Sequence, residues 1–229
     1  MPESEQNSLQ WIEAQDWAER YREQLRRRKR RLAGRFFKRA LDVIASGIGI
    51  LLLALPFLII AASIKRDADG PVFFRQVRVG RDLKLFKIMK FRTMRLDSDR
   101  AGRQITVGAD PRITKSGAFL RKHKIDELPQ LFNVFLGEMS LVGSRPEVPA
   151  YVDAYKEPYR VLLADRPGIT DLASLTYRDE SRLLGESDNP HETYLQEVLP
   201  AKLKISLTYQ EEATFFSDLR LIFRTVLGS

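Results

Sequence analysis

Two adjacent carboxylates, Asp126 and Glu127, precede a segment whose apolar residues recur at three- and four-residue steps. This spacing predicts a helix. Pro129 is tolerated only in a first helical turn, so it places both acids at the N-terminal end. The exposed N–H groups and the helix dipole favour anions there. Acids at this position are most often simple caps, but two of them beside an anion-binding helix start also fit phosphate chemistry.

Adjacent residues on a helix do not face each other, so this pair is a poor candidate for the opposed acid and base of a glycosidase. Divided roles fit better. One carboxylate can attack, as in aspartyl-phosphate enzymes, and the other can hold a hard cation such as Mg²⁺. A helix start should also keep the attacking carboxylate ionised, because it stabilises negative charge.

Phosphate groups also require cations, and arginine is suited to bidentate phosphate contacts. Each basic residue taken alone is more simply a solvated surface charge. As a set, interleaved with Gly, Pro and short apolar runs, they indicate a phosphate-binding site. The candidates are Lys90, Arg92, Arg112, Lys115, Arg121 and Arg145.

The composition narrows the possible functions. The 229 residues suffice for one catalytic domain with a small appendage. A net charge of +8 suits nucleic acid, anionic lipid headgroups or phosphorylated substrates as partners. The chain has no cysteine, which excludes disulfides and thiolate catalysis, and its two histidines are too few for a His-rich zinc site.

An apolar segment at residues 40–64 is long enough to span a bilayer. Pro56 lies inside it and predicts a kink. Basic residues flank both ends, and positive charge tends to stay on the cytoplasmic side. We therefore favour a re-entrant helical hairpin with both chain termini cytoplasmic, over a straight crossing or a buried soluble core helix. The basic run at 26–31 should contact anionic lipid headgroups.

The remaining segments predict a helix-rich α/β protein. A β-hairpin is expected around residues 80–82, and an amphipathic, interfacial helix at 215–227. We expect a polar loop at 92–112 and further helices at 116–124, 150–165 and 191–213, the last interrupted at Pro200. The predicted organisation is a polar, basic helical extension at 1–34, a membrane segment at 35–66 and a catalytic domain at 67–229.

Several ordered motifs resemble those of the bacterial sugar transferases, of the monotopic phosphoglycosyl transferase type. The resemblance begins near residue 36 and continues to the C-terminus. It rests on the apolar segment with Pro56 and on residues 70–76, 90–94, 112–115, 126–131, 137–143, 145–146 and 167–170. The segment 1–34 lies outside it and is interpreted as an interfacial or self-associating helix, which leaves a homo-oligomer possible.

The resemblance implies transfer of a sugar-1-phosphate from a UDP-sugar to polyprenyl (undecaprenyl) phosphate, with release of UMP. The reaction would take place at the cytoplasmic face of the bacterial inner membrane and begin a surface polysaccharide. It further implies that Asp126 is the nucleophile and carries a phosphosugar, that Glu127 helps bind Mg²⁺, and that Arg121, Arg145 and Lys90 contact phosphate. The family's re-entrant helix is broken at a proline, which agrees with Pro56.

Two departures from the family pattern stand out. The loop at 143–146 reads Gly-Ser-Arg-Pro where members often have Gly-Pro-Arg-Pro, so the arginine is kept. Residues 171–179 differ from the usual Gly-Trp-Ala-Gln-Val-Asn-Gly-Arg, which leaves the sugar open. A membrane-anchored interaction protein without catalysis is a rival interpretation, but a scaffold has no need for an Asp-Glu pair among cations. Nucleic-acid binding is weaker still, because the basic run is confined to one flank and no known motif accompanies it.

Overall fold

The computed structural model describes residues 3–30, 32–67, 69–95 and 110–227, without side-chain detail for 3–7 and 226. Within these ranges the protein is helix-rich with two small sheets, which confirms the α/β, helix-rich class. The predicted polar loop at 92–112 lies mostly outside the described residues.

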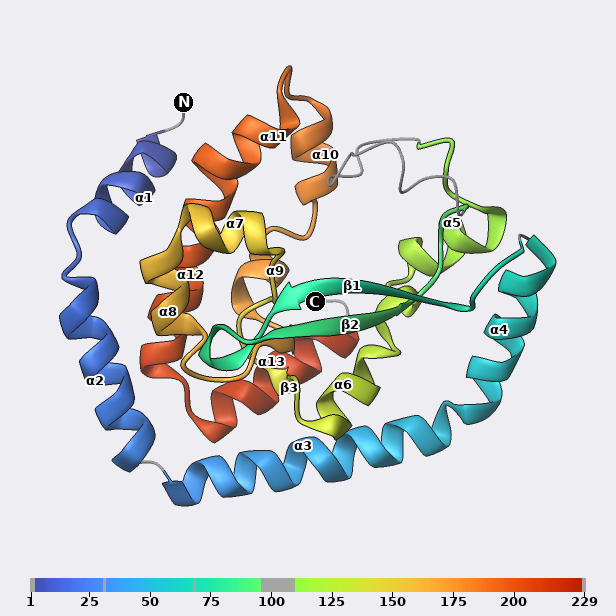
Figure 1. Ribbon diagram of the computed structural model, residues 1–229, viewed down its shortest axis with the longest axis horizontal. Coiled ribbons are helices and arrows are strands. Elements are labelled where there is room, and N and C mark those ends of the chain that lie inside the picture. The colour runs from blue at the N-terminus through green and yellow to red at the C-terminus, as the bar shows by residue number, and fades with distance from the viewer. Residues whose placement is uncertain (1–2, 31, 68, 96–109, 228–229) are drawn as a thin grey trace.

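The N-terminal helices pack on the rest of the chain. Helices α1 (Glu3–Glu13) and α2 (Trp17–Arg30) run along one edge of the molecule (Figure 1). Ile12 is buried in the main apolar cluster, and Trp17 and Tyr21 pack against the same cluster. These apolar side chains of the N-terminal extension are therefore packed within this chain.

Helices α3 (Leu32–Leu52) and α4 (Ala54–Asp67) meet at a bend of 60°. Pro56 lies in the first turn of α4, where its ring would clash with the carbonyl of residue 52 if the helix were continuous. This explains why α3 ends there and agrees with the predicted kink. Among the described helices, none is by itself long and apolar enough to cross a membrane, whereas this bent pair together meets the length and composition required.

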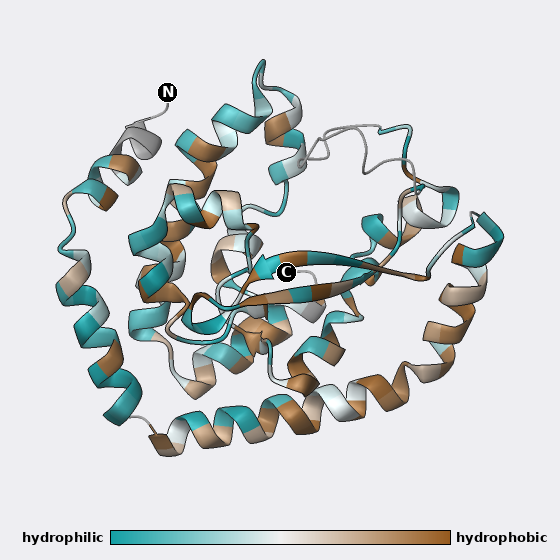
Figure 2. Ribbon diagram, in the orientation of Figure 1, coloured by the Kyte–Doolittle hydropathy of each residue, from teal (hydrophilic) through white to brown (hydrophobic). Residues whose placement is uncertain are grey.

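The two faces of the bent pair differ. Phe57 and Ile64 of α4 point inward and pack with Phe91, Leu120 and the partly buried segment that follows the acidic pair. The opposite face leaves large apolar side chains exposed. In Figure 2 the brown of hydrophobic residues dominates the later part of α3 and the first part of α4. The exposed side chains include Ile44, Ile48, Leu51, Leu55, Leu58 and Ile59.

The predicted β-hairpin is confirmed. Strands β1 (Phe73–Val79) and β2 (Leu85–Phe91) pair antiparallel across the middle of the molecule (Figure 1). A short 3₁₀ turn (Arg81–Leu83) joins them, with Asp82 and Leu83 at positive φ. The hairpin brings Lys90 of β2 toward the helices that follow.

After the hairpin come helix α5 (Lys115–Lys122), a 3₁₀ turn (Ile125–Glu127), helix α6 (Gln130–Leu136) and strand β3 (Ser140–Val142). Helix α5 confirms the short basic helix expected at 116–124. Strand β3 pairs in parallel with β4 (Gly168–Thr170), a second sheet that the sequence analysis missed. A Cβ on Gly168 would lie 2.1 Å from the Gly143 backbone N, so this close approach requires glycine.

Helices α7 (Pro149–Ala154) and α8 (Lys156–Leu162) replace the single helix predicted at 150–165. The helices α9 (Leu172–Thr176), α10 (Glu180–Gly185) and α11 (Pro190–Thr193) follow. A π-helical segment (Tyr194–Val198) leads into α12 (Leu199–Glu212). The π-helical segment continues directly into α12, so the irregularity lies just before Pro200, near the interruption expected there.

The last helix, α13 (Phe215–Leu227), confirms the amphipathic helix predicted at the C-terminal end. Its inward residue is Leu221, which is buried. Phe216 and Phe223 are exposed, as the apolar face of an interfacial helix would be. The helix therefore keeps an apolar surface that no other described element covers.

Candidate active site

The acidic pair lies in the 3₁₀ turn between α5 and α6. Lys124 opens this turn with a left-handed backbone, φ 57°. Pro129 is the cap residue of α6, which starts at Gln130. The prediction that Pro129 places both acids near a helix start is therefore confirmed, with the refinement that Asp126 and Glu127 occupy a separate turn just before the helix.

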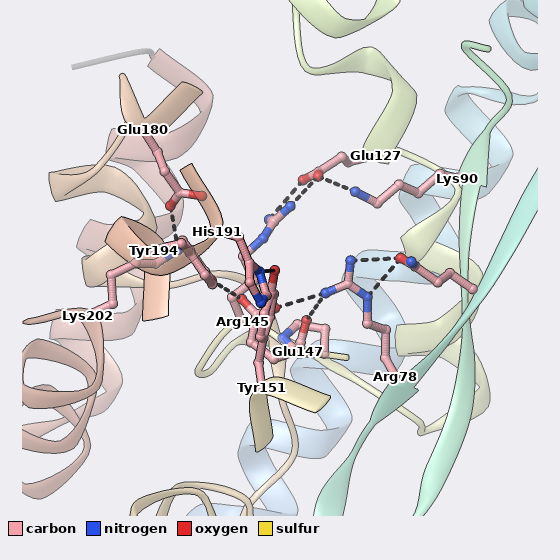
Figure 3. Close-up of polar contacts among 12 residues, drawn as sticks. Arg78, Lys90, Glu127, Arg145, Glu147, Tyr151, Glu180, His191, Tyr194 and Lys202 are labelled. Atoms are coloured by element: carbon pink, nitrogen blue, oxygen red, sulfur yellow. Dashed lines mark hydrogen bonds and ion pairs between the residues drawn. The ribbon is translucent and has the colours of Figure 1, made fainter. Parts of the chain in front are cut away.

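Two cations from different elements hold the Glu127 carboxylate. Lys90 Nζ of β2 donates to Glu127 Oε1 at 2.7 Å. Arg145, in the extended segment after β3, donates from Nη2 to Oε1 at 2.6 Å and from Nη1 to Oε2 at 3.3 Å. In Figure 3 the carboxylate lies between these two side chains. The structure thus brings together three residues that are far apart in sequence.

This clamp fixes the protonation of Glu127. Burial by itself would raise the pKa of the carboxyl, but the charges and hydrogen bonds of Arg145 and Lys90 outweigh it and hold the pKa well below its usual range. Burial lowers the pKa of Lys90, against the opposing effect of Glu127. The charge of Glu127 raises the pKa of Arg145. Glu127 is therefore ionised and paired.

Asp126 differs from its neighbour. Its carboxylate accepts no hydrogen bond from any residue that the structure describes. Burial, followed by the negative charge of Glu127, raises its pKa, while Lys90, Arg121 and Lys124 act in the opposite direction. The direction of this pKa shift runs against the expectation that the helix start favours the ionised carboxylate, because burial and the adjacent acid both oppose ionisation. The side chain is nevertheless unengaged and faces several cations.

Of the other predicted cations, Arg121 is the one whose charge lowers the pKa of Asp126. Its positive charge acts on Asp126, and within the described ranges it forms no ion pair. It is part of α5, whose first turn is capped by Thr114.

The structure does not bring Arg92 and Arg112 to the Glu127 clamp. Arg92 is buried, and its Nη1 donates to the Asp69 carbonyl at 2.5 Å. Arg112 makes ion-paired hydrogen bonds to Asp110, the closest at 2.5 Å, and these lower the pKa of Asp110 to about 2. Both guanidinium groups thus have partners within the protein, and their proposed phosphate contacts stay a prediction.

A buried network behind Arg145 was not foreseen. Arg78 of β1 donates to Glu147 Oε2 at 3.0 Å and to the Pro146 carbonyl at 3.0 Å. The hydroxyl of Tyr194, in the π-helical segment, donates a hydrogen bond to Glu147 Oε1 at 2.9 Å. Figure 3 shows this chain of contacts beside Arg145. The network ties the segment that carries Arg145 to the hairpin and to the C-terminal helices.

The sequence signal for this network is weak, since it consists of one acid, Glu147, near Pro146 and Pro149. Asn133 plays a similar part on the other side of the clamp. Its side chain accepts from the Met89 N–H at 2.9 Å and donates to the Lys87 carbonyl at 2.9 Å, so α6 is fixed against β2. This keeps Lys90 within reach of Glu127.

The donor set can be tested for a metal ion. No group of three or more His, Cys, Asp or Glu residues clusters as a ligand set in the part of the chain that the structure describes. Mg²⁺ needs fewer protein ligands, since it is often bound through one or two carboxylates plus substrate phosphates and waters. Two adjacent carboxylates without sulfur or imidazole fit such a hard cation.

Known proteins are similar to this chain over most of its length. The sequence profile of the family described as "Bacterial sugar transferase" matches residues 33–228. The exopolysaccharide production protein PSS of Rhizobium leguminosarum bv. phaseoli is 41% identical over 198 residues, which cover 83% of this chain and 94% of that protein. The exopolysaccharide production protein ExoY of Rhizobium meliloti is 34% identical over 210 residues, covering 84% of this chain and 85% of that protein.

Longer relatives match over part of their length. The UDP-glucose:undecaprenyl-phosphate glucose-1-phosphate transferase of Escherichia coli is 36% identical over 197 residues, 84% of this chain but 40% of that protein. The chain therefore spans nearly all of PSS and about two-fifths of the E. coli enzyme. The profile covers α3 to α13 and leaves α1 and α2 outside it.

Proposed function

Because this chain belongs to the bacterial sugar transferase family and is a phosphoglycosyl transferase, we propose that it moves a sugar-1-phosphate from a UDP-sugar to a polyprenyl phosphate such as undecaprenyl phosphate. The product would begin a surface polysaccharide. The observation that carries the proposal is the unengaged Asp126 carboxylate beside a Glu127 held by Lys90 and Arg145. The names of the relatives, which include a UDP-glucose:undecaprenyl-phosphate glucose-1-phosphate transferase and exopolysaccharide production proteins, support the substrate classes.

The chemistry follows from these residues. An oxygen of Asp126 attacks the phosphorus that bears the sugar, the bond from that phosphorus to the UMP oxygen breaks, and UMP leaves. The sugar phosphate is then joined to Asp126 as an acyl phosphate. An oxygen of the polyprenyl phosphate attacks the same phosphorus and restores the carboxylate. Covalent catalysis of this kind divides one difficult transfer into two easier steps.

The cations would act on the diphosphate of the donor. Arg145 offers a planar fork and Lys90 a point charge, and both already lie at Glu127. Arg121 adds positive charge on the Asp126 side. Charge that develops on the leaving phosphate would be stabilised by these preorganised donors.

We include Mg²⁺ in the proposal as the cofactor. Glu127 would hold it together with the substrate phosphates once Lys90 or Arg145 turns from the carboxylate to the diphosphate. When bound, the ion would neutralise phosphate charge.

We also propose that the enzyme lies at the cytoplasmic face of the bacterial inner membrane, with α3 and α4 entering the bilayer as a re-entrant hairpin. The exposed apolar side chains of these helices support this placement, as do Phe216 and Phe223 of α13. The basic residues at both ends of the pair favour cytoplasmic termini and contact with anionic lipids. The acidic turn packs against α4, so the reacting carboxylate would lie close to a lipid-borne acceptor.

The covalent step can be tested without the acceptor. Enzyme, Mg²⁺ and a suitable UDP-sugar should release UMP in a burst of at most one equivalent per active site. The protein should gain the mass of the sugar phosphate on the peptide that holds Asp126, and Asp126→Asn should abolish both signals because an amide is a far poorer nucleophile. If UMP appears only when polyprenyl phosphate is also present, and no adduct forms, transfer is direct and Asp126 is not a nucleophile. A panel of UDP-sugars in the same assay would identify the sugar.

A further inference from the structure

A cavity lies away from the acidic pair. Its volume is about 460 Å³, and α2, α3, β3 and the helices α12 and α13 supply its walls. Figure 1 shows these elements around the corner where α2 passes into α3. Asp126 and Glu127 are not among the residues that line it, nor are Lys90, Arg121 and Arg145. The cavity is therefore separate from the proposed site of transfer.

Basic side chains outnumber acidic ones in the lining. The cations are Arg27, Arg28, Arg35, Lys38, Arg39, Arg81 and Arg166, and the acids are Asp42, Asp165, Asp171 and Asp218. Asp42 accepts hydrogen bonds from Ser140 and from the Leu141 N–H, and it pairs with none of these cations.

Three arginines of this region share two acidic partners. Arg28 and Arg81 both pair with Asp82, at 2.8 and 3.3 Å, and Arg35 reaches Asp165 only at 3.9 Å. Burial, together with the charges of Arg28 and Arg81, lowers the pKa of Arg35, while Asp165 and Asp82 act in the opposite direction. The pKa of Arg166 is likewise lowered, by burial and by Arg81 and Arg39. Cations that destabilise one another in this way would be relieved by a bound anion.

The lining also holds apolar side chains, among them Leu41, Leu141, Leu162, Phe215 and Ile222, beside uncharged polar ones such as Gln24, Ser206 and Tyr209. Arg35, Lys38 and Arg39 lie on the last helical turns before the apolar run that starts at Ala40. A hairpin entering a bilayer here would hold these cations at the level of lipid headgroups. The cavity thus presents cations and apolar side chains together.

We propose that this cavity binds an anionic phospholipid, with its phosphate among Arg28, Arg35 and Arg81 and its chains along the apolar lining. The lipid would join α2, which lies outside the matched family region, to α3 and the core. This site goes beyond the proposed transfer reaction, since it uses none of the residues of the Glu127 clamp.

Thermal unfolding of the full chain in neutral detergent tests the proposal. Short-chain phosphatidylglycerol should raise Tm by several degrees, as a ligand of the folded state does, whereas phosphatidylcholine should not. The double variant Arg35→Gln with Arg81→Gln should lose most of this rise. Without lipid, its Tm should stay close to that of the wild type, because crowding of like charge is relieved while Asp82 keeps Arg28 and Asp165 keeps Gln24 as a partner. The matched control, Lys65→Gln with Arg66→Gln, removes two exposed cations at the other end of the hairpin and should keep the rise.

Two further measurements distinguish a phospholipid from other phosphate-bearing ligands of the cavity. Inorganic phosphate that raises Tm as much as the lipid would show a free-anion site and overturn the lipid assignment. Native mass spectrometry can show whether polyprenyl phosphate displaces phosphatidylglycerol. Displacement would mark the cavity as an acceptor site and would also overturn the phospholipid assignment. An equal lipid response of wild type and double variant contradicts the proposal directly. If the double variant does not fold, Arg81→Gln in the hairpin turn replaces it. The UMP burst should persist in these variants, so the two proposals fail independently.

Discussion

At the residue scale, two neighbouring acids have opposite properties. Glu127 is held ionised by Lys90 and Arg145, whereas Asp126 is unengaged and burial and the charge of Glu127 raise its pKa. The environment thus separates a fixed anion from a group that can react. Such divergence between adjacent titratable groups is typical of active sites.

Glu127→Gln should move the acid limb of the first transfer step to lower pH. Removing the neighbouring negative charge lowers the pKa of Asp126, and a nucleophile with a lower pKa stays ionised in more acidic solution. Single-turnover UMP release, measured across pH in wild type and variant, checks this. Glu157→Gln, at an exposed position on α8, should leave the profile unchanged. An unmoved or upward-shifted limb in Glu127→Gln would show that its charge does not act on Asp126.

At the element scale, the parallel contact of β3 with β4 decides where Arg145 lies. Gly143 and Gly168 approach so closely that neither tolerates a side chain. Arg145 follows this contact by two residues, and the network of Glu147 with Arg78 and Tyr194 fixes the next part of the chain. The short second sheet therefore supports the Glu127 clamp.

Gly168→Ala should lower Tm markedly and reduce turnover, because the new Cβ would lie 2.1 Å from the Gly143 N and overpacking of this kind costs about 1–3 kcal/mol or more. The control is Gly34→Ala on α3, where a Cβ meets nothing within 4 Å. That change should leave Tm equal or slightly higher, since alanine is favoured over glycine in helices by about 0.5–1 kcal/mol. Equal Tm values for the two variants would refute this account.

The bend between α3 and α4 also belongs to this scale. Pro56→Leu should restore a continuous helix and allow some molecules to span the bilayer, because leucine supplies the missing N–H and removes the ring clash. Single cysteines near residues 10 and 225 can be labelled from either side of the membrane. In the wild type both should react from the cytoplasmic side. Labelling of the two wild-type sites from opposite sides would eliminate the re-entrant hairpin.

At the scale of the whole molecule, the extension outside the matched family region is part of the core. Ile12 is buried among residues of α8 and α12, and Arg20 forms an ion pair with Glu211. The interpretation of this segment as an interfacial or self-associating helix stays a prediction, but its apolar stripe already has partners within the chain.

Deleting residues 1–34 should lower Tm yet leave measurable turnover at low temperature in lipid discs. Burial of a side chain such as Ile12 contributes roughly 1.5–3 kcal/mol, whereas no residue of the Glu127 clamp comes from this segment. Tm and UMP release measured on the same preparation separate the two effects. Complete loss of UMP release in a truncation that still unfolds cooperatively would contradict the expected division of roles.

The sequence by itself determined the features with a local cause. A turn signal at residues 80–82 placed the hairpin, Pro56 defined the break between α3 and α4, and Pro129 placed the acidic pair before α6. The motifs sufficed to identify the family, which the comparisons confirm. Each of these follows from spacing or backbone restriction within a short segment.

Only the tertiary structure decided which charges meet. Nothing in the spacing distinguished Lys90 and Arg145, which hold Glu127, from Arg92 and Arg112, which bind Asp69 and Asp110 instead. The raised pKa of Asp126 likewise depends on burial and on neighbours gathered from β2, α5 and the turn itself. Pairing of short parallel strands and desolvation of charges arise from contacts between segments that are distant in sequence. The periodicity of a single segment cannot predict such contacts.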